Sequence, residues 1–569
     1  MAYTAPLGDF AFLFDHVVDY AALAATPAFA EAPRELADHI LDEAGRLAAE
    51  VLAPVNRAGD QSPARMENGV VRSSPGFAEA YRAIAEGGWI GMSAGVEHGG
   101  LGLPMVLTTA VNEMFAGACL SLQLNPLLTQ GQIEALEHHA SDALKALYLP
   151  RLISGEWNGT MNLTEAGAGS DVGALTSRAV PNGDGTYAVT GQKIFITWGD
   201  SDLVENVCHL VLARLPDGAP GTRGISLFLV PKYIPDDAGR PGVANRLKVV
   251  SLEHKLGLHG SPTAVMQFDG ATGWLVGAPH AGMKAMFTMM NNARLGVATQ
   301  GVGIAEAATQ AALAYAAERR QGRTPRGDTG ILDHADVRRM LATMKAMTFA
   351  ARGIALDCAL AIDMARATGD EGWAARAALL TPIAKAFGTD VGCEVAQMGI
   401  QVHGGMGFIE ETGAAQFARD VRVTAIYEGT NGIQAMDLVG RKMMDGGEAA
   451  FELLDELQAA AERAKAAEPD LASAVWTAAE TLREATEALI GQEMTDRFAG
   501  AVPYLRAFAL VLGGHYHLRA AVAAGQGSGR AALAAFYIRR LMPEHAAHLL
   551  HAREGAAGVY AVGPEVIAA

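Results

Sequence analysis

The chain has 569 residues, half of them hydrophobic, and a formal net charge of −18. This length is too great for a single core and predicts three or four domains. Because phosphate contacts require a basic surface, an acidic chain of this kind argues against nucleic acid as a partner.

The first 20 residues, MAYTAPLGDFAFLFDHVVDY, contain three aspartates and no basic segment. They match neither a secretory signal nor an Arg-rich transit peptide, and we find no uncharged apolar run of about 18 residues that predicts a membrane span. The cysteines are far apart and form no CxxC pair, so we expect neither disulfides nor a metal site; they are Cys119, Cys208, Cys358 and Cys393. Together these features predict a cytoplasmic protein.

Four regions follow one another along the chain. Residues 1–155 carry Ala and Leu at helical spacing and predict an N-terminal α-helical domain. Residues 156–280 contain short β-branched runs separated by turns and predict an antiparallel β-barrel or sandwich. Residues 281–445 predict a four-helix-bundle-like domain, and residues 446–569 predict an additional helical domain after the break DGGEA. Without βαβ alternation, this order predicts a multidomain α+β fold.

A glycine-rich loop follows the first strand of the β region, in the segment MNLTEAGAGSD (residues 161–171). Gly167 and Gly169 allow a flat ligand to approach the backbone closely. The hydroxyls of Thr164 and Ser170 suit a ring that carries carbonyls and nitrogens. Neither G-x-G-x-x-G nor a P-loop lysine is present, which excludes those two nucleotide motifs. A glycine-rich hairpin without a ligand is the alternative interpretation of this loop taken alone.

The next marked strand, YAVTGQKIFITWG (residues 187–199), is rich in β-branched and aromatic residues. Strand alternation places Phe195 and Thr197 on one face. We expect that face to cover a planar heterocycle.

One carboxylate stands out near the end of the third region, in AIYEGTNGIQ (residues 425–434). Glu428 lies between apolar residues and the small residues Gly429, Thr430 and Gly432. Burial against the apolar flank would raise its pKa toward the working pH, as a general base for a carbon-bound proton requires. For this motif alone, a glutamate in a solvated turn is the alternative interpretation.

Two further segments, YAAERRQGR (residues 315–323) and GIQVHGGMGF (residues 399–408), complete a set of four. In this order and spacing the set resembles the acyl-CoA dehydrogenase family, flavoproteins that desaturate acyl-CoA thioesters between Cα and Cβ. The resemblance covers residues 80–445. The opening YTAPLGDFAFLF, the phrase HKLGLHGSPT and the extra helical region are similar to the long subgroup that includes 3-methylmercaptopropionyl-CoA dehydrogenase.

The resemblance implies that Glu428 is the base that takes the pro-R α-proton while non-covalent FAD, one per chain, accepts a hydride from Cβ. It also implies two donors to the thioester oxygen, the backbone N–H of Glu428 and a ribityl hydroxyl of FAD. Some relatives carry the base on the helix before the arginine. This chain has Ala293 at that position, which leaves Glu428 as the base.

The resemblance also assigns binding residues. The isoalloxazine of FAD is expected to contact Met161, Leu163, Thr164, Gly169, Ser170, Phe195, Thr197, Thr430 and Gly432. The acyl-CoA is expected to contact Ser170, Asn291, Arg294 and Gly429. We expect Arg294 at the head of a helix near the catalytic end of the CoA site, with a helix-entry salt bridge as the alternative.

A third group of residues is implied to reach the FAD of a partner subunit. Arg319 matches an arginine that contacts the diphosphate across the interface, and Gln401 and Gly405 match the adenosine contact. Gln321 and Gly322 replace the Thr and Phe of the commoner R-K-T-F-G pattern, which leaves the diphosphate contact open. A solvated charge run is the alternative at Arg319. This group predicts a homodimer.

The expected electron acceptor is an electron-transfer flavoprotein, and the expected product is a trans-2-enoyl-CoA. An acyl-CoA oxidase that uses O₂ is one alternative, and a non-catalytic flavin-binding DNA-protection protein is another. The intact Glu428 argues against the second, as do ten Lys or Arg against fifteen Asp or Glu in residues 446–569. The acyl group stays open between 3-methylmercaptopropionyl and another short or medium chain, because sequence does not fix the helix register at the pocket.

Overall fold

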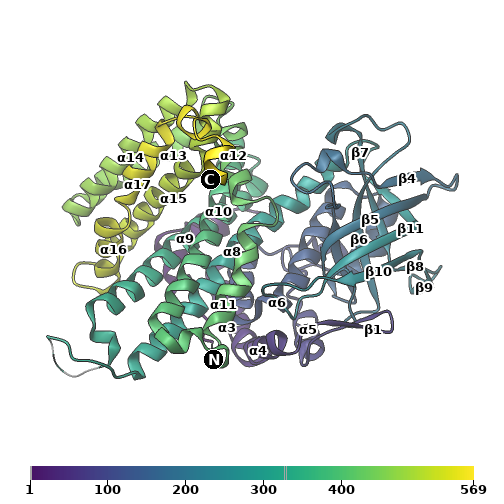
Figure 1. Ribbon diagram of the computed structural model, residues 1–569, viewed down its shortest axis with the longest axis horizontal. Helices are drawn as coiled ribbons and strands as arrows, with labels where there is room; N and C mark the ends of the chain where they lie inside the picture. Colours follow the sequence, from purple (N-terminus) through teal and green to yellow (C-terminus); the bar gives the residue numbers. More distant parts are fainter. Residues whose placement is uncertain (1–2, 326, 328–329) are drawn as a thin grey trace.

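The computed structural model describes residues 3–325, 327 and 330–569. Its helices form one large lobe and its main sheet forms a second, with N-terminal helices between them (Figure 1). This arrangement confirms the predicted α+β class.

The N-terminal region is mainly helical, but it also contains a small hairpin of strands β1 (Arg65–Glu67) and β2 (Val70–Arg72). The hairpin departs from the all-helical expectation, and its cause is local: Asn68 and Gly69 both take positive φ, 51° and 78°, as a two-residue Asn-Gly turn requires. A π-helical turn, Ala48–Leu52, joins α3 to α4. The helices are α1 (Leu7–His16), α2 (Tyr20–Ala24), α3 (Arg34–Leu47), α4 (Ala53–Gln61), α5 (Phe77–Glu86), α6 (Met105–His139) and α7 (Asp142–Ile153).

Helix α6 is the central element of this region and packs against both lobes, through α8 (Gly282–Glu318) and through strand β3 (Trp157–Asn162). In the described part of the chain it alone is long and apolar enough to cross a membrane, and 94% of its apolar window is buried inside the protein. The carboxylate of Asp363 accepts the N–H groups of Met105 and Val106, both at 2.8 Å, and so caps the helix. Helix α6 is therefore a core helix.

The β lobe contains a seven-stranded mixed sheet. Strands β3 and β6 run parallel, whereas β5, β7, β10 and β11 pair antiparallel, so the expected fully antiparallel sheet is wrong in this detail. The sheet is not a closed barrel, because β4 meets β6 at a single pair, Arg178 with Arg214. The remaining strands are β4 (Arg178–Pro181), β5 (Tyr187–Thr197), β6 (Asn206–Arg214), β7 (Ile225–Pro231), β8 (Tyr233–Pro235), β9 (Pro241–Ala244), β10 (Leu247–Leu252) and β11 (Thr263–Val276).

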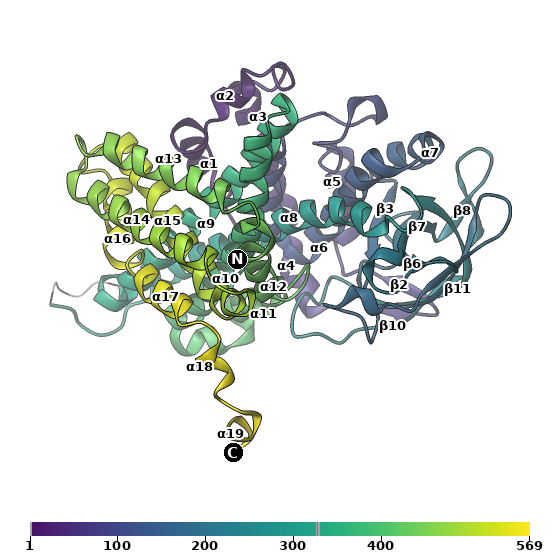
Figure 2. The same cartoon turned by 90° about the horizontal axis from the view of Figure 1, so that it is seen from above.

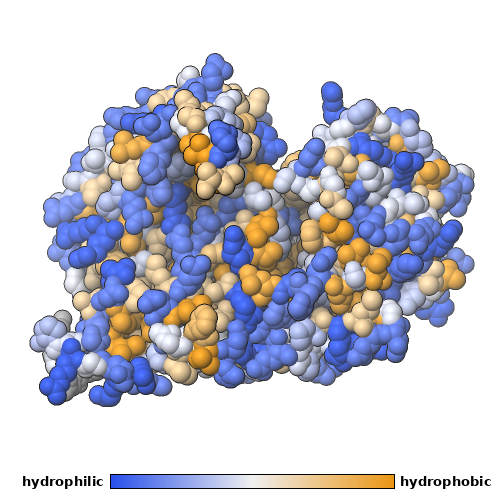
Figure 3. Space-filling view, in the orientation of Figure 1, coloured by the Kyte–Doolittle hydropathy of each residue, from blue (hydrophilic) through white to orange (hydrophobic). Residues whose placement is uncertain are grey.

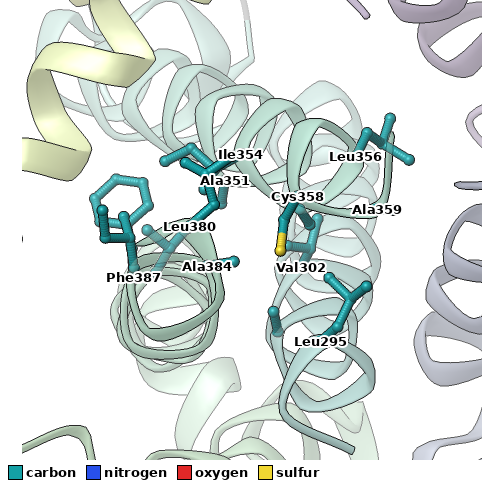
Figure 4. Packing of buried hydrophobic residues seen from close by; sticks show 14 of the residues in the cluster. Leu295, Val302, Ala351, Ile354, Leu356, Cys358, Ala359, Leu380, Ala384 and Phe387 are labelled. Atoms are coloured by element: carbon teal, nitrogen blue, oxygen red, sulfur yellow. The ribbon is translucent and has the colours of Figure 1, made fainter. Parts of the chain in front are cut away.

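Three long helices, α8, α9 (Ala335–Thr368) and α10 (Glu371–His403), form the core of the helical lobe. Figure 4 shows Leu295 of α8, Ile354 of α9 and Leu380 of α10 in one apolar cluster. Helices α8 and α10 approach closely, since a Cβ on Gly301 would lie 2.2 Å from the Gly388 carbonyl oxygen. Two short helices, α11 (Ala414–Val421) and α12 (Asn431–Val439), follow the bundle.

The C-terminal region adds helices that pack on this bundle, mainly through α15 against α9, α10 and α12. The last two helices project from the body (Figure 2). The region consists of α13 (Glu448–Ala464), α14 (Pro469–Ile490), α15 (Met494–Ala524), α16 (Gly529–Arg540), α17 (Glu544–Arg553), α18 (Ala557–Tyr560) and α19 (Pro564–Ala568).

A largely buried ion cluster, which we call the Arg352 cluster, joins two helices of the N-terminal region to two helices of the helical lobe. Arg352 of α9 donates to Glu113 of α6 at 2.6 and 2.8 Å, to Glu306 of α8 at 2.9 Å and to Asp9 of α1 at 3.1 Å. Lys345 also pairs with Asp9, at 2.6 Å. Arg530 pairs with Asp9 as well, at 2.8 Å, so three cations face three carboxylates and the cluster holds the helices together.

Candidate active site

Glu428 lies in a short loop, residues 426–430, which we call the base loop. It connects the 3₁₀ turn η8 (Arg422–Ala425) to helix α12. Glu428 takes φ of 56° and Gly429 takes φ of 84°. The left-handed region is costly for a glutamate, so surrounding contacts must hold the loop in place. Thr430 begins α12 as its N-cap and accepts the N–H of Ile433 at 3.3 Å.

The Glu428 carboxylate is in a dry and incompletely paired environment. Its Oε2 atom is buried and has no hydrogen-bond partner among the described residues. Burial raises the pKa of Glu428 to about 7, against the opposing effect of the charges on Arg294 and Lys385. A carboxylate with this pKa is partly ionised at neutral pH and suits a general base.

Arg294 lies beside the base loop, but not at the head of a helix as we expected. It is in the interior of α8, which begins at Gly282. The helix start carries no side-chain cap, which explains why the sequence did not mark it. Arg294 is 6% exposed, and its Nη1 lies 3.4 Å from Asn291 Oδ1 and 3.9 Å from Asp437 Oδ2. Burial lowers its pKa.

The predicted residues Asn291, Arg294, Glu428 and Gly429 come together here. A Cβ added to Gly429 would lie 3.9 Å from Arg294 Nη2, which measures how near the arginine is to the loop. Ser170, the fourth predicted substrate residue, is on the exposed glycine-rich loop of the β lobe instead. In the space-filling view a notch separates the helical lobe from the β lobe (Figure 3).

Two further side chains hold the base loop, and the sequence did not reveal them. Lys385 of α10 is completely buried and donates to the carbonyl oxygen of Gly429 and to Asn431 Oδ1, both at 2.9 Å. Gln434 Nε2 donates to the carbonyl oxygen of Glu428 at 3.2 Å. The one available signal was a lysine inside the apolar helical stretch TPIAKAFG, where a charge needs a partner.

A buried polar chain leads away from the other side of the base. The Tyr427 hydroxyl donates to Gln300 Oε1, and Gln300 Nε2 donates to Gln123 Oε1 at 3.0 Å. This chain links the base loop to α8 and α6. The sequence did not reveal these contacts, because the paired residues are far apart along the chain.

Of the nine residues expected to line a flavin, seven belong to the β lobe, whereas Thr430 and Gly432 lie at the start of α12 in the helical lobe. Met161, Leu163 and Thr164 are half-buried, and the Thr164 carbonyl accepts the N–H of Ile194 at 2.9 Å, which ties the loop to β5. On β5, Thr197 is half-buried and Phe195 is 59% exposed with φ of 61°.

These residues fit a flat heterocycle. Gly169 and Ser170 are exposed, and a Cβ on Gly169 would meet nothing closer than 3.9 Å. An exposed aromatic ring, an open glycine backbone and nearby hydroxyls suit stacking and hydrogen bonding with a planar ring.

Glu165 fixes the glycine-rich loop from within. Its carboxylate accepts the N–H groups of Thr176 and Ser177 at 2.7 and 3.0 Å and the ammonium of Lys193 at 2.8 Å. Burial alone would raise its pKa, but Lys193 outweighs burial and lowers the pKa to about 2. The loop is therefore held by a permanently ionised carboxylate.

Arg319, Gln401 and Gly405 lie at the opposite end of the bundle, and all three are exposed. Helix α8 separates Arg319 from Arg294 by about 38 Å at 1.5 Å per residue, so this chain does not bring the three to Glu428. The Tyr315 and His403 rings stack at 4.5 Å and join the ends of α8 and α10. No atom lies within 4 Å of a Cβ added at Gly405, which leaves room for a ligand.

Comparison with known proteins matches almost the whole chain. Four family models match, described as acyl-CoA dehydrogenase N-terminal domain (residues 35–156), middle domain (160–271) and C-terminal domain (280–444), and acetyl-CoA dehydrogenase C-terminal like (453–562). The 3-methylmercaptopropionyl-CoA dehydrogenase of Ruegeria pomeroyi is 45% identical over 519 residues, which cover 89% of this chain and 88% of that protein.

Solved structures give the same result at the level of the fold. Butyryl-CoA dehydrogenase from Megasphaera elsdenii matches with a TM-score of 0.62 and 26% identity, over 72% of this chain and 98% of that chain. Caenorhabditis elegans ACDH-11, solved with C11-CoA, matches with a TM-score of 0.80 and 20% identity, over 95% of this chain and 92% of that chain. The second match shows that the C-terminal helices also belong to a known fold.

Proposed function

Since the chain belongs to the acyl-CoA dehydrogenase family and is an oxidoreductase that acts on acyl-CoA, we propose a role for each residue of the site in this reaction. Glu428 takes the α-proton of the thioester. FAD, when bound, supplies the acceptor for the hydride that leaves Cβ. The observation that carries this proposal is the buried Glu428 Oε2, which has no partner among the described residues and belongs to a carboxyl group with pKa about 7.

The base loop also provides a donor for the thioester oxygen. The backbone N–H of Glu428 donates to no group in the part of the chain that the structure describes. A free N–H aimed at a developing oxyanion contributes about 3–4 kcal/mol in comparable sites. Proton abstraction from a weakly acidic Cα needs such a donor, because the negative charge moves onto the thioester oxygen. The base and the oxyanion donor therefore come from the same residue.

We also propose which residues bind the two ligands. The flavin ring is held by Met161, Leu163, Thr164, Gly169, Ser170, Phe195, Thr197, Thr430 and Gly432. The thioester end of the substrate is held by Asn291, Arg294, Gly429 and Ser170. Phe195 supports this proposal because its exposed ring, beside the open loop, is available to stack on a planar heterocycle.

We propose a homodimer in which Arg319, Gln401 and Gly405 contact the FAD of the partner subunit. Their exposure and the open space at Gly405 support this arrangement. Replacing the guanidinium in Arg319→Gln is expected to weaken FAD retention at least tenfold, measured by flavin absorbance after gel filtration. Light scattering that gives a monomer with a full complement of FAD would contradict the proposal.

The proposed substrate is 3-methylmercaptopropionyl-CoA or another short or medium acyl-CoA, with the relative from Ruegeria pomeroyi as support. The test is anaerobic titration of the yellow protein with a panel of acyl-CoAs, in which the true substrates bleach the flavin. Reoxidation of the bleached protein by an electron-transfer flavoprotein but not by air supports the dehydrogenase, whereas rapid reoxidation by air indicates an oxidase. A protein bleached by no acyl-CoA would overturn the proposal.

A further inference from the structure

Lys385 contacts the base loop at the point where the backbone is least favourable. Glu428 and Gly429 both take positive φ, and the first is a conformation that a glutamate rarely adopts. Lys385 and Gln434 donate to the two carbonyl oxygens that follow the base, those of Gly429 and Glu428, at 2.9 and 3.2 Å. These two donors fix the orientation of the peptide planes next to the carboxylate.

Lys385 is itself held in a polar network behind the loop. Its Nζ donates to Asn431 Oδ1 at 2.9 Å, and Asn431 Nδ2 donates to Asp390 Oδ1 at 2.7 Å and to Thr389 Oγ1 at 3.0 Å. The adjacent residue of α10, Ala384, lies in the apolar cluster between the long helices (Figure 4). The helix register that packs this cluster thus also aims the lysine at the base loop.

We infer that Lys385 is a positioning residue for the reaction: it holds the base loop in its left-handed conformation and places a positive charge near the Glu428 carboxylate. This inference rests on the proposed function of Glu428. The lysine does not contact the reacting carbon, and it acts through the loop and through its charge.

The electrostatic part of this role involves a small set of groups. Glu428 is faced by the charges of Arg294 from α8 and Lys385 from α10. Lys385 is faced in turn by Glu428, by Asp390 and Cys393 on α10, and by Arg294. Burial lowers the pKa of Lys385 to about 8, so the ammonium is still charged where the base must be ionised. Loss of this charge leaves only Arg294 to favour the carboxylate, so the pKa of Glu428 rises.

The test compares Lys385→Met, which removes the donor and the charge, with Lys385→Gln, which keeps an amide donor but no charge. Anaerobic stopped-flow reduction of the flavin by saturating 3-methylmercaptopropionyl-CoA and by butyryl-CoA is measured from pH 5.5 to 9. We expect the acid limb of the pH–rate profile, where the rate rises with pH, to move up by about one pH unit in both variants. We expect the plateau rate to fall at least tenfold in Lys385→Met and less in Lys385→Gln.

The matched control is Lys345→Met, since Lys345 is a helix lysine with two carboxylate partners in the Arg352 cluster. Its acid limb should stay at the wild-type position. A readout independent of turnover is the infrared band of the Glu428 carboxyl group in the resting protein, which is identified by its absence in Glu428→Gln. In both Lys385 variants this band should titrate at higher pH than in the wild type.

Unchanged limbs and unchanged plateau rates in both Lys385 variants, with an unmoved infrared titration, would overturn the inference while the function of Glu428 stands. If no acyl-CoA reduced the flavin of the wild-type protein, the proposed function would fail, and the role of Lys385 would fail with it.

Discussion

Two buried sites in this protein set carboxylates beside cations, and they differ in how completely the polar atoms are paired. In the Arg352 cluster one guanidinium donates to Asp9, Glu113 and Glu306. At the base loop Arg294 and Lys385 lie near Glu428, yet its Oε2 has no partner among the described residues.

The two sites also differ in pKa. Burial alone would raise the pKa of Asp9, but Arg352 and Lys345 outweigh it and lower that pKa well below its usual value. At Glu428 burial dominates and the pKa rises to about 7. Within the cluster the pKa of Glu306 is also lowered, whereas burial outweighs Arg352 at Glu113 and raises the pKa of that carboxyl group. The pairing at Asp9 thus fixes a charge, whereas incomplete pairing at Glu428 leaves a carboxylate able to exchange a proton near neutral pH.

The largest effect is expected for Glu428→Gln. Glutamine keeps the size of the side chain but accepts no carbon-bound proton, and Ala293 provides no substitute base. The reduction rate at saturating acyl-CoA should fall by about 10⁴-fold, the upper end for loss of a general base, with substrate binding retained. Glu113→Gln, in the paired cluster, is the matched control and should leave the rate per folded molecule unchanged. A Glu428→Gln variant that bleaches at near the wild-type rate would remove Glu428 from its role.

The next effect should fall on stability rather than on rate. Arg352→Met leaves the buried Glu113 and Glu306 and the half-buried Asp9 without their shared guanidinium. Breaking a buried ion network of this kind costs about 3–5 kcal/mol of unfolding free energy. Urea denaturation measures this loss. A variant as stable as the wild type would show that the Arg352 cluster is not structural.

A smaller effect is expected on the pH dependence of stability that Glu428 causes. The folded pKa of Glu428 is above its ordinary value of 4.5, so its contribution to stability is present at low pH and is lost as the pH rises toward 7. Glu428→Gln should therefore gain stability relative to the wild type between pH 5 and pH 8, on the order of 1 kcal/mol. Denaturation at both pH values tests this, and a relative loss at pH 8 would contradict the sign.

The sequence predicted the order of helical and β regions and the protein family, because local patterns and short motifs carry both signals. Asn291, Arg294, Glu428 and Gly429 do converge. Lys385 was missed because its role depends on a contact between residues 44 apart, which no helical periodicity encodes.

Other differences have the same origin. The start of α8 was misplaced because Ala281 gives no capping signal. The parallel pairing of β3 with β6 depends on a long-range crossover, which strand patterns in the sequence do not specify. Local sequence patterns thus predicted which segments are helices and strands, whereas the pairing of strands and the ends of helices depend on long-range packing.

The most direct test of the central claim is the pH dependence of flavin reduction in the wild-type protein under single-turnover conditions. If Glu428 is the base, the rate at saturating acyl-CoA should rise about tenfold per pH unit on the acid side and level off above a pKa of about 7. The substrate can move this value, but it cannot remove the limb. A rate that stays constant from pH 5.5 to 9, with the residual rate of Glu428→Gln equally flat and close to it, would contradict the account.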